Sequence, residues 1–466
     1  MSESSIYFNE AEFRDRVFAC WLGKNVGGTL GMPFEGKREV NDASYYTDVK
    51  PGEPAANDDL DLQLLWLKAL QDHDGAVDAR ILGEYWLRHV PVDWNEYGIC
   101  QANMRLGLHP PVCGEFRNEW KHSNGAWIRT EIWACLAPGC PAEAAKMARE
   151  DACVDHGAGE GTLAAIFVAS IESAAFVEKN RDRLLEIGLA MIPEGCELAR
   201  AVRVAISAWR AGKDWLAARE AVVAATEATG WFQAPRNVAF VVVGWLYGRD
   251  FGDCICKAVN CGDDTDCTGA TLGSLLGILG GTAAIPVRWS EPIGREIKTV
   301  AIAGFDNVSN LDDLTDQTVE MAKRISALRG LRVGIGPGAT DLSGVGSLAD
   351  RSAAEALWRL SPYRVVWREG GVEIVLDYGG EPVVVPGARR EIVLKVSGPG
   401  ADDAVASVSG PRTGWTHDVR EWGEEGEFRV EFEAGPQVPE HTVFEVAVRC
   451  GHHAIALPVV LFSSRS

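Results

Sequence analysis

The chain has 466 residues, 47% of them hydrophobic, and a formal net charge of −21. The length predicts two or three domains, and the hydrophobic content is sufficient for a packed globular core. The negative charge disfavours nucleic acids and anionic membranes as partners, and it is compatible with cations and small-molecule substrates.

The first residues, MSESSIYFNEAEFRD, lack the basic stretch followed by an apolar run that a secretory signal requires. The twelve cysteines contain no Cys-x-x-Cys pair. Without an export signal, reduced thiols are favoured over a disulfide framework. We therefore expect a cytoplasmic protein.

Residues 10 to about 330 are expected to be mostly helical. Phe13, Val17 and Trp21 recur every fourth residue, as on one face of a helix. Glycines then recur with the same period in two distant segments, which suits the close crossing of two helices. The two sets are Gly23, Gly27 and Gly31, and Gly269, Gly273 and Gly277.

The uncharged run from Cys267 to Val287 is long enough to span a bilayer. It is rich in glycine, ends near Pro286 and follows three aspartates. We therefore interpret it as a buried helix of a globular domain, with no membrane partner.

The pattern changes near residue 333. Residues 333–352 are rich in glycine and are expected to form a linker. Residues 353–466 contain short alternating or β-branched runs separated by Gly and Pro, a pattern typical of a β-sandwich. The predicted fold is a mainly α domain over residues 1–332, followed by a small all-β sandwich domain.

Two dense acidic clusters each precede an apolar helix. The first holds Asn57, Asp58, Asp59 and Asp61, and the second holds Asp263, Asp264 and Asp266. Acids at a helix start suit the helix dipole, and such clusters are usually solvated. Hard divalent cations also prefer carboxylate oxygens, so the alternative is one metal site that both clusters share.

Several segments, in order, resemble the ADP-ribosylglycohydrolase family. GKNVGGTLGMPFEG resembles its Gly-rich first helix, which ends in a glutamate, here Glu35, and NDDLDLQLLWLKAL resembles its acidic helix start. AVNCGDDTDCTGATLGSLLGILGG is similar to its late aspartate motif. NGAWIRTE and DHGAGEGTLAA resemble its middle segments, the second being a helix start that carries a histidine. The resemblance covers about residues 12–330 and implies an orthogonal all-helical domain.

The resemblance implies a Mg²⁺ centre that binds ribose hydroxyls beside the glycosidic bond to be cleaved. Glu35 and Asp58 are the implied acid and base, with neither role assigned. The implied metal ligands are Asn57, Asp58, Asp59, Asp264, Asp266 and Cys267. The implied substrate-binding residues are Asn124, Gly125, Trp127, Arg129 and His156.

Four residues in the two acidic segments depart from the family pattern. Asn57 and Cys267 stand where the family has threonine, and a thiol is a poor Mg²⁺ ligand, so one or two ions are possible. Asp263 replaces a glycine and Asp61 an uncharged residue. These extra carboxylates either compensate for the altered metal ligands, shift the metal preference of the site toward Mn²⁺, or face solvent.

Three substrate-binding residues also have structural interpretations. Arg129 is suited to a phosphate or to an ion pair, Trp127 to ring stacking or to the core, and His156 to substrate contact or to a polar helix start.

We expect a divalent-metal-dependent glycohydrolase that cleaves a ribosyl bond in an ADP-ribosylated protein or a related compound. The alternatives are a nucleoside or nucleotide N-glycosidase and a non-catalytic scaffold or binding protein. The sequence does not indicate the oligomeric state.

Overall fold

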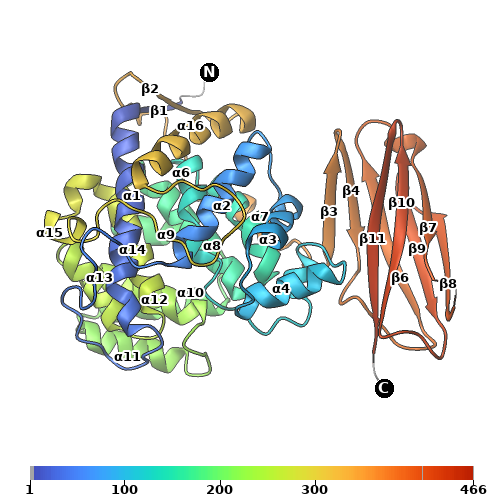
Figure 1. Ribbon diagram of the computed structural model, residues 1–466, viewed down its shortest axis with the longest axis horizontal. Helices are drawn as coiled ribbons and strands as arrows, with labels where there is room; N and C mark the ends of the chain where they lie inside the picture. The colour runs from blue at the N-terminus through green and yellow to red at the C-terminus, as the bar shows by residue number, and fades with distance from the viewer. Residues whose placement is uncertain (1–4, 412, 424, 465–466) are drawn as a thin grey trace. The chain divides into compact units, whose positions relative to one another are not determined.

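The computed structural model describes residues 5–411, 413–423 and 425–464. Two compact units divide the chain, and Figure 1 shows one to be helical and the other rich in strands. The helical unit contains residues 1–92, 120–152 and 159–359, and the strand unit contains residues 93–119, 153–158 and 360–466. The predicted combination of a mainly α domain with a C-terminal β domain is confirmed.

Helices account for most of the first unit. They are α1 (Glu10–Gly31), α2 (Asp58–Asp72), α3 (Ala79–His89), α6 (Glu131–Leu136), α7 (Pro141–His156), α8 (Glu160–Ala175), α9 (Arg181–Ala190), α10 (Glu197–Arg210), α11 (Trp215–Ala225), α12 (Ala234–Tyr247), α13 (Phe251–Asn260), α14 (Thr265–Gly280), α15 (Val287–Ser290), α16 (Leu311–Arg329) and α17 (Arg351–Trp358). Short 3₁₀ turns occur at η1 (Met32–Phe34), η2 (Trp127–Arg129) and η3 (Thr282–Ala284). The last residues of α7 belong to the second unit.

Helices α1 and α14 cross in direct backbone contact inside this unit, as the sequence predicts (Figure 1). A Cβ atom on Gly27 would lie 1.9 Å from the carbonyl oxygen of Gly269, and one on Gly273 would lie 2.1 Å from that of Gly23. The Thr265 hydroxyl also donates a hydrogen bond of 2.8 Å to the Gly31 carbonyl. Glycine is therefore required on both faces of the crossing.

The segment expected to be a linker is partly ordered against the N-terminus. Strand β2 (Val333–Gly336) pairs in parallel with β1 (Ile6–Asn9). Beyond β2, the Asn9 backbone N–H donates to the Thr340 hydroxyl at 2.9 Å. The two ends of the helical unit are thus held together.

The second unit is a sandwich of two sheets. Their strand orders are β5-β11-β10-β7 and β3-β4-β6-β9-β8, antiparallel except for the β5–β11 pair. The strands are β3 (Arg364–Glu369), β4 (Val372–Asp377), β5 (Val383–Val384), β6 (Arg389–Ser397), β7 (Val405–Ser409), β8 (Trp415–Glu421), β9 (Glu427–Ala434), β10 (His441–Cys450) and β11 (His453–Ser463). Buried and exposed residues alternate along β9 and β10, so both sheets contribute to one core. A short 3₁₀ turn, η4 (Ala401–Asp403), precedes β7.

Two helices also belong to this unit, α4 (Asn95–Arg105) and α5 (Val112–Glu115). Leu108, Val112 and Phe116 are buried in the same hydrophobic core as the strands. The Phe116 and Phe462 rings lie 4.7 Å apart between centroids. The sandwich core therefore includes side chains from the middle of the chain.

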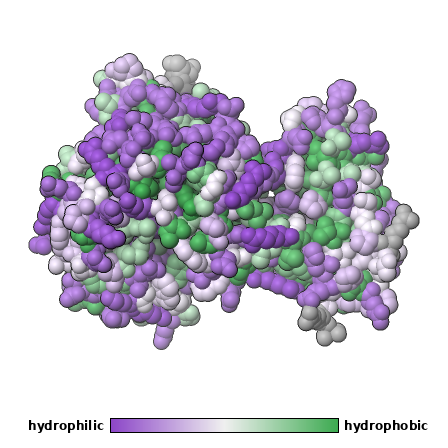
Figure 2. Space-filling model, viewed as in Figure 1, coloured by the Kyte–Doolittle hydropathy of each residue, from purple (hydrophilic) through white to green (hydrophobic). Residues whose placement is uncertain are grey.

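No helix among the described residues combines the length and the apolar character that a membrane span requires. The uncharged run after Cys267 forms α14, most of which is buried by its helical neighbours. Hydrophilic residues cover much of the visible face of the helical unit (Figure 2). The sequence interpretation of this run as a buried helix is confirmed.

Candidate functional site

The two acidic clusters of the sequence meet in the helical unit. Asp58 and Asp59 begin α2, Asp264 and Asp266 lie at the start of α14, and Glu35 follows η1. Ligand atoms of Glu35, Asp264 and Asp266 lie within 4.8 Å of one another, and so do those of Asp59, Asp266 and Cys267. The term acid cluster is used below for five carboxylates, those of Glu35, Asp58, Asp59, Asp264 and Asp266.

Asn57 joins the starts of the two helices. Its side-chain oxygen accepts the Asp59 backbone N–H at 2.8 Å, which caps α2. Its amide nitrogen donates to Asp266 Oδ2 at 3.1 Å. The amide oxygen has a second lone pair, which is available to a metal ion.

Asn124 fixes the neighbouring aspartate. Its amide nitrogen donates to Asp264 Oδ2 at 2.6 Å, and its oxygen accepts the Trp127 indole N–H at 2.9 Å. The Asp264 backbone N–H donates to the side chain of Asn237 at 3.1 Å. Asp264 is therefore held by hydrogen bonds on its backbone and on one carboxylate oxygen.

Some carboxylate oxygens of the cluster have no hydrogen-bond donor among the described residues. They are Asp59 Oδ2, Asp264 Oδ1 and Asp266 Oδ1, on side chains that are at least nine-tenths buried. A buried anionic oxygen without a donor is costly, and a divalent cation would offset that cost. The donor set of carboxylate and amide oxygens fits Mg²⁺ or Mn²⁺.

Burial and mutual repulsion raise the pKa values of the cluster. Burial is the main cause for Asp59 and Asp264, whose pKa values lie well above the ordinary range, and neighbouring aspartates add to it. Partial burial and the charges of Asp266 and Asp58 raise the pKa of Glu35 to about 7. Glu35 is the exposed member of its group, so it is the one that solvent reaches.

A buried lysine lies beside the cluster and was not predicted. Lys24 of α1 places its Nζ 2.7 Å from Glu131 Oε1 and 3.9 Å from Asp59 Oδ2. Gln63 donates to Glu131 Oε2 at 2.8 Å and to the Asp59 backbone carbonyl at 2.9 Å. The available signal was a single charge among uncharged residues, at Lys24 in the second half of α1 and at Glu131 in α6.

The extra acids, Asp61 and Asp263, have partners of their own. Asp61 accepts the backbone N–H groups of Val300 and Ala301 at 2.7 and 2.6 Å. Asp263 is buried and pairs with Arg236 Nη1 at 3.1 Å and with Arg38 at 3.4 Å. Asp61 thus stabilises a loop, and Asp263 belongs to an ion-pair network. Both side chains are buried, so the alternative that they face solvent is wrong.

The segment after Asn124 is inside the unit. Trp127 and Arg129 are fully buried. Arg129 pairs with Asp151 at 3.0 Å and also donates to the Gly125 carbonyl. These contacts match the core and ion-pair interpretations of the two side chains, and they hold the Asn124–Gly125 turn in place.

His156 lies in the strand unit, whereas the acid cluster lies in the helical unit. It ends α7, so the predicted helix start at this residue was wrong. Gly157 has a positive φ of 53° and breaks the chain before α8. His156 Nδ1 lies 2.9 Å from Asp155 and its Nε2 lies 3.9 Å from Glu96.

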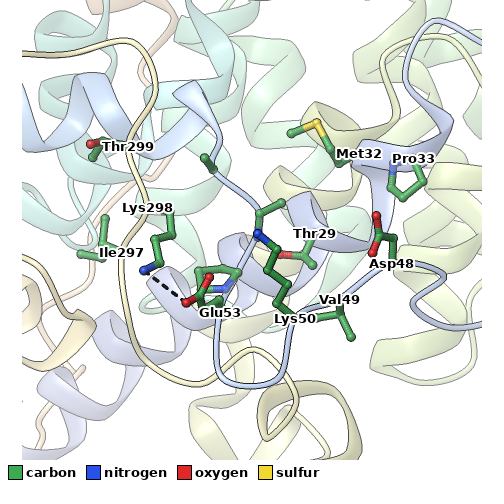
Figure 3. A pocket seen from close by; sticks show the side chains of 13 residues that line it. Thr29, Met32, Pro33, Asp48, Val49, Lys50, Glu53, Ile297, Lys298 and Thr299 are labelled. Carbon is green, nitrogen blue, oxygen red and sulfur yellow. Dashed lines mark hydrogen bonds and ion pairs between the residues drawn. The ribbon is translucent and has the colours of Figure 1, made fainter.

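A pocket of about 660 Å³ opens beside the chain segments that carry Glu35 and Asp58. Its walls include Met32 and Pro33, just before Glu35, and residues 54–56, just before Asn57 (Figure 3). Lys50 and Lys298 both line the pocket, and the Lys298 ammonium faces Glu53 at 3.8 Å (Figure 3). The pocket thus carries two amines beside the segments that lead to Glu35 and Asn57.

Comparison with known proteins gives one family match. A family model described as ADP-ribosylglycohydrolase matches residues 9–328. A solved structure titled "ADP-ribosylglycohydrolase-related protein complex" is 21% identical, with a TM-score of 0.45, and the match covers 68% of this chain and 99% of that one. A search of curated proteins found no match.

Proposed function

The chain belongs to the ADP-ribosylglycohydrolase family, and from this premise we propose that it hydrolyses a ribosyl N- or O-glycosidic bond with a bound divalent ion. The proposed substrate is an ADP-ribosylated protein or a related ADP-ribosyl compound. The observation that carries the proposal is the meeting of two distant acidic helix starts around buried oxygens that no described residue reaches with a hydrogen-bond donor.

The proposed metal is Mg²⁺, with Mn²⁺ as the alternative. The residues available to hold it are Asn57, Asp58, Asp59, Asp264, Asp266 and Cys267. A bound divalent ion would orient the ribose hydroxyls and lower the pKa of a nearby water molecule. Asn57 also connects the two helix starts, because its side-chain amide makes hydrogen bonds with both Asp59 and Asp266.

Glu35 and Asp58 are the proposed acid and base. In hydrolysis the water oxygen bonds to the anomeric carbon of ribose, the glycosidic bond breaks, and the departing group takes up a proton. A carboxylate near this carbon accepts the proton of the attacking water. Glu35 is the exposed member of its group, so a water molecule or a substrate can reach its carboxylate.

The proposed substrate-binding residues act in two ways. The Asn124–Gly125 turn lies against Asp264, whereas the buried Trp127 and Arg129 support that turn from inside. His156, in the strand unit, keeps a proposed substrate role that rests on the resemblance alone. The pocket carries two amines, on Lys50 and Lys298, and two carboxylates, on Asp48 and Glu53, so its lining charges balance.

The test is product release followed by mass spectrometry. ADP-ribosyl-arginine, ADP-ribosyl-serine, ADP-ribosylated protein and a panel of nucleosides are each incubated with Mg²⁺, with Mn²⁺ and with EDTA. We expect metal-dependent release of ADP-ribose, which Asp58→Ala and Asp264→Ala abolish. Release of a free base would instead indicate a nucleoside N-glycosidase. Absence of turnover on every substrate, in a protein that binds no metal, would indicate a scaffold.

A further inference from the structure

Four of the five carboxylates of the acid cluster, together with Cys267, form two overlapping groups that share Asp266. The outer group is Glu35, Asp264 and Asp266, and the inner group is Asp59, Asp266 and Cys267. Resting on the proposed function, we infer that the cluster holds a single divalent ion in the outer group. In place of a second ion, the Lys24 ammonium and the Cys267 thiol face the two carboxylate oxygens of Asp59 in the inner group.

Lys24 supplies a fixed positive charge on the inner side. Its side chain is 1% exposed, and its Nζ lies 3.9 Å from Asp59 Oδ2. The ammonium is anchored at 2.7 Å by Glu131, which Gln63 holds in turn. Burial of the side chain and the ion pair with Glu131 together hold the Lys24 ammonium in this position.

Cys267 is the hydrogen-bond donor to the other carboxylate oxygen of Asp59. Its Sγ lies 3.4 Å from Asp59 Oδ1, in the geometry of a thiol that donates a hydrogen bond. A protonated thiol is a poor ligand for a hard divalent ion. Asp59 therefore faces a thiol donor on one oxygen and an ammonium on the other, and both compete with a metal ion there.

Among the described residues, no ammonium or thiol takes the place of an ion in the outer group. Asp264 Oδ1 and Asp266 Oδ1 are buried without a donor among the described residues. The outer group is also open to solvent at Glu35, which gives an ion a route of entry. A second divalent ion in the inner group would lie near the Lys24 ammonium and be repelled by it. The charges thus favour one ion in the outer group.

The test counts ions and measures their coupling. Purified full-length protein is stripped with EDTA and titrated with Mn²⁺ by isothermal calorimetry, and the filled protein is examined by electron paramagnetic resonance. We expect about one Mn²⁺ per chain, with the six-line spectrum of an isolated ion. Two ions per chain with a coupled spectrum would overturn the inference and leave the glycohydrolase proposal standing. No bound Mn²⁺ would overturn both the inference and the metal dependence of the proposed function.

A variant tests the roles of Lys24 and Cys267 directly. Lys24→Met with Glu131→Gln removes the ammonium together with its counter-charge, and Cys267→Thr adds an oxygen ligand. If circular dichroism shows a native fold, we expect this triple variant to bind about two Mn²⁺ per chain and to give a coupled spectrum. Binding of one ion by the folded triple variant would overturn the assigned roles. Should the triple variant fail to fold, the ion count of the unaltered protein decides.

The matched control removes an exposed ion pair on α2. Lys68→Met with Asp72→Asn deletes one lysine and one acid away from the acid cluster. We expect this control to bind the same number of Mn²⁺ ions as the unaltered protein. A changed count in the control would show that the loss of any ion pair alters the site, which would overturn the role of Lys24.

Discussion

Asp266 is the residue on which both groups of the acid cluster depend. It contributes an oxygen to each group and accepts a hydrogen bond from Asn57. Asp266→Asn removes one negative charge and one proposed metal ligand while nearly preserving the shape. We expect Mn²⁺ affinity, measured by calorimetry, to fall by at least about 100-fold.

Asp48 supplies the control for this change, because it lines the pocket and is outside the acid cluster. Asp48→Asn should retain Mn²⁺ affinity within about threefold. Equal losses in the two variants would mean that general surface charge, rather than coordination by Asp266, attracts the ion.

At the scale of single residues, the sequence was informative about ligands and silent about their partners. The dense acids predicted that Asp58, Asp59, Asp264 and Asp266 matter, and the structure brings them together. The sequence could not distinguish Asp263 from these four residues. Asp263 has a positive φ of 61° and pairs with Arg236, and neither feature can be inferred from the order of the residues. Lys24 was missed because a single charge in the uncharged second half of α1 does not reveal which distant acid it meets.

The crossing of α1 and α14 determines where the cluster forms. A Cβ on Gly27 would meet three backbone atoms of α14 at 1.9 to 2.6 Å, and backbone cannot rotate away. We expect Gly27→Ala to lower the free energy of unfolding in urea by at least about 3 kcal/mol. It should also weaken Mn²⁺ binding, because the start of α14 must move.

Gly195→Ala is the matched substitution at an exposed turn, where an added Cβ would have no neighbour within 4 Å. Its free energy of unfolding should stay within about 0.5 kcal/mol of the original. If Gly27→Ala behaved like this control, close backbone contact would not stabilise the crossing.

Helix α13, which leads into the second acidic cluster, has a pH-sensitive start. Burial opposes ionisation of Asp253, but hydrogen bonds from Lys257 and Arg249 outweigh it and lower the pKa of Asp253 to about 2. A lowered pKa stabilises the fold above the unfolded pKa of about 3.9, and this stability is lost as the pH falls toward 2.

We therefore expect Asp253→Asn to destabilise the protein by about 1 kcal/mol at pH 7, a value reduced because solvent screens these side chains. Urea unfolding at pH 7, 4 and 3 should show the difference shrinking as acid is added. Glu227→Gln, at an exposed position, serves as the control. A difference that is constant with pH would refute the ionic origin.

At the scale of elements, periodic patterns predicted more than isolated residues did. Glycines spaced by four predicted the crossing of α1 and α14, which the structure confirms. His156 was placed at a helix start, although it ends α7. The sequence DHGAGEG contains both a helix end and the next helix start within a few residues, so periodicity could not assign the histidine to either one.

For the whole molecule, the sequence predicted a helical part followed by strands, and the structure confirms this order. The exact division at residues 332 and 353 stays a prediction. The membership of residues 93–119 in the strand unit had no signal in the sequence. Apolar residues in that segment, such as Val112 and Phe116, suit any core, and only the fold reveals that theirs is formed by strands far along the chain.

Deleting residues 360–466 should consequently harm the remaining chain. Leu108, Val112 and Phe116 would lose the strands that bury them. We expect the truncated chain to bind the dye ANS and to aggregate below the melting temperature of the full chain. In the full chain, Phe462→Ala should cost about 3 kcal/mol, because its ring packs on Phe116.

The exposed Val385 provides the comparison for Phe462. Val385→Ala should leave the melting temperature nearly unchanged. A truncated chain that stays monomeric, binds no ANS and melts like the full chain would show that residues 93–119 need no strands to cover them.

The α1–α14 crossing also has a consequence for synthesis on the ribosome. Thr265 and Gly31, which touch in the finished protein, are 234 residues apart in the chain. At roughly 10 residues per second, the first helix waits about 20 s for its partner to emerge. During that time Phe13, Val17 and Trp21 lack the covering they have in the folded chain. The apolar face of the first helix therefore stays uncovered for much of synthesis, and the acid cluster can form only late in translation.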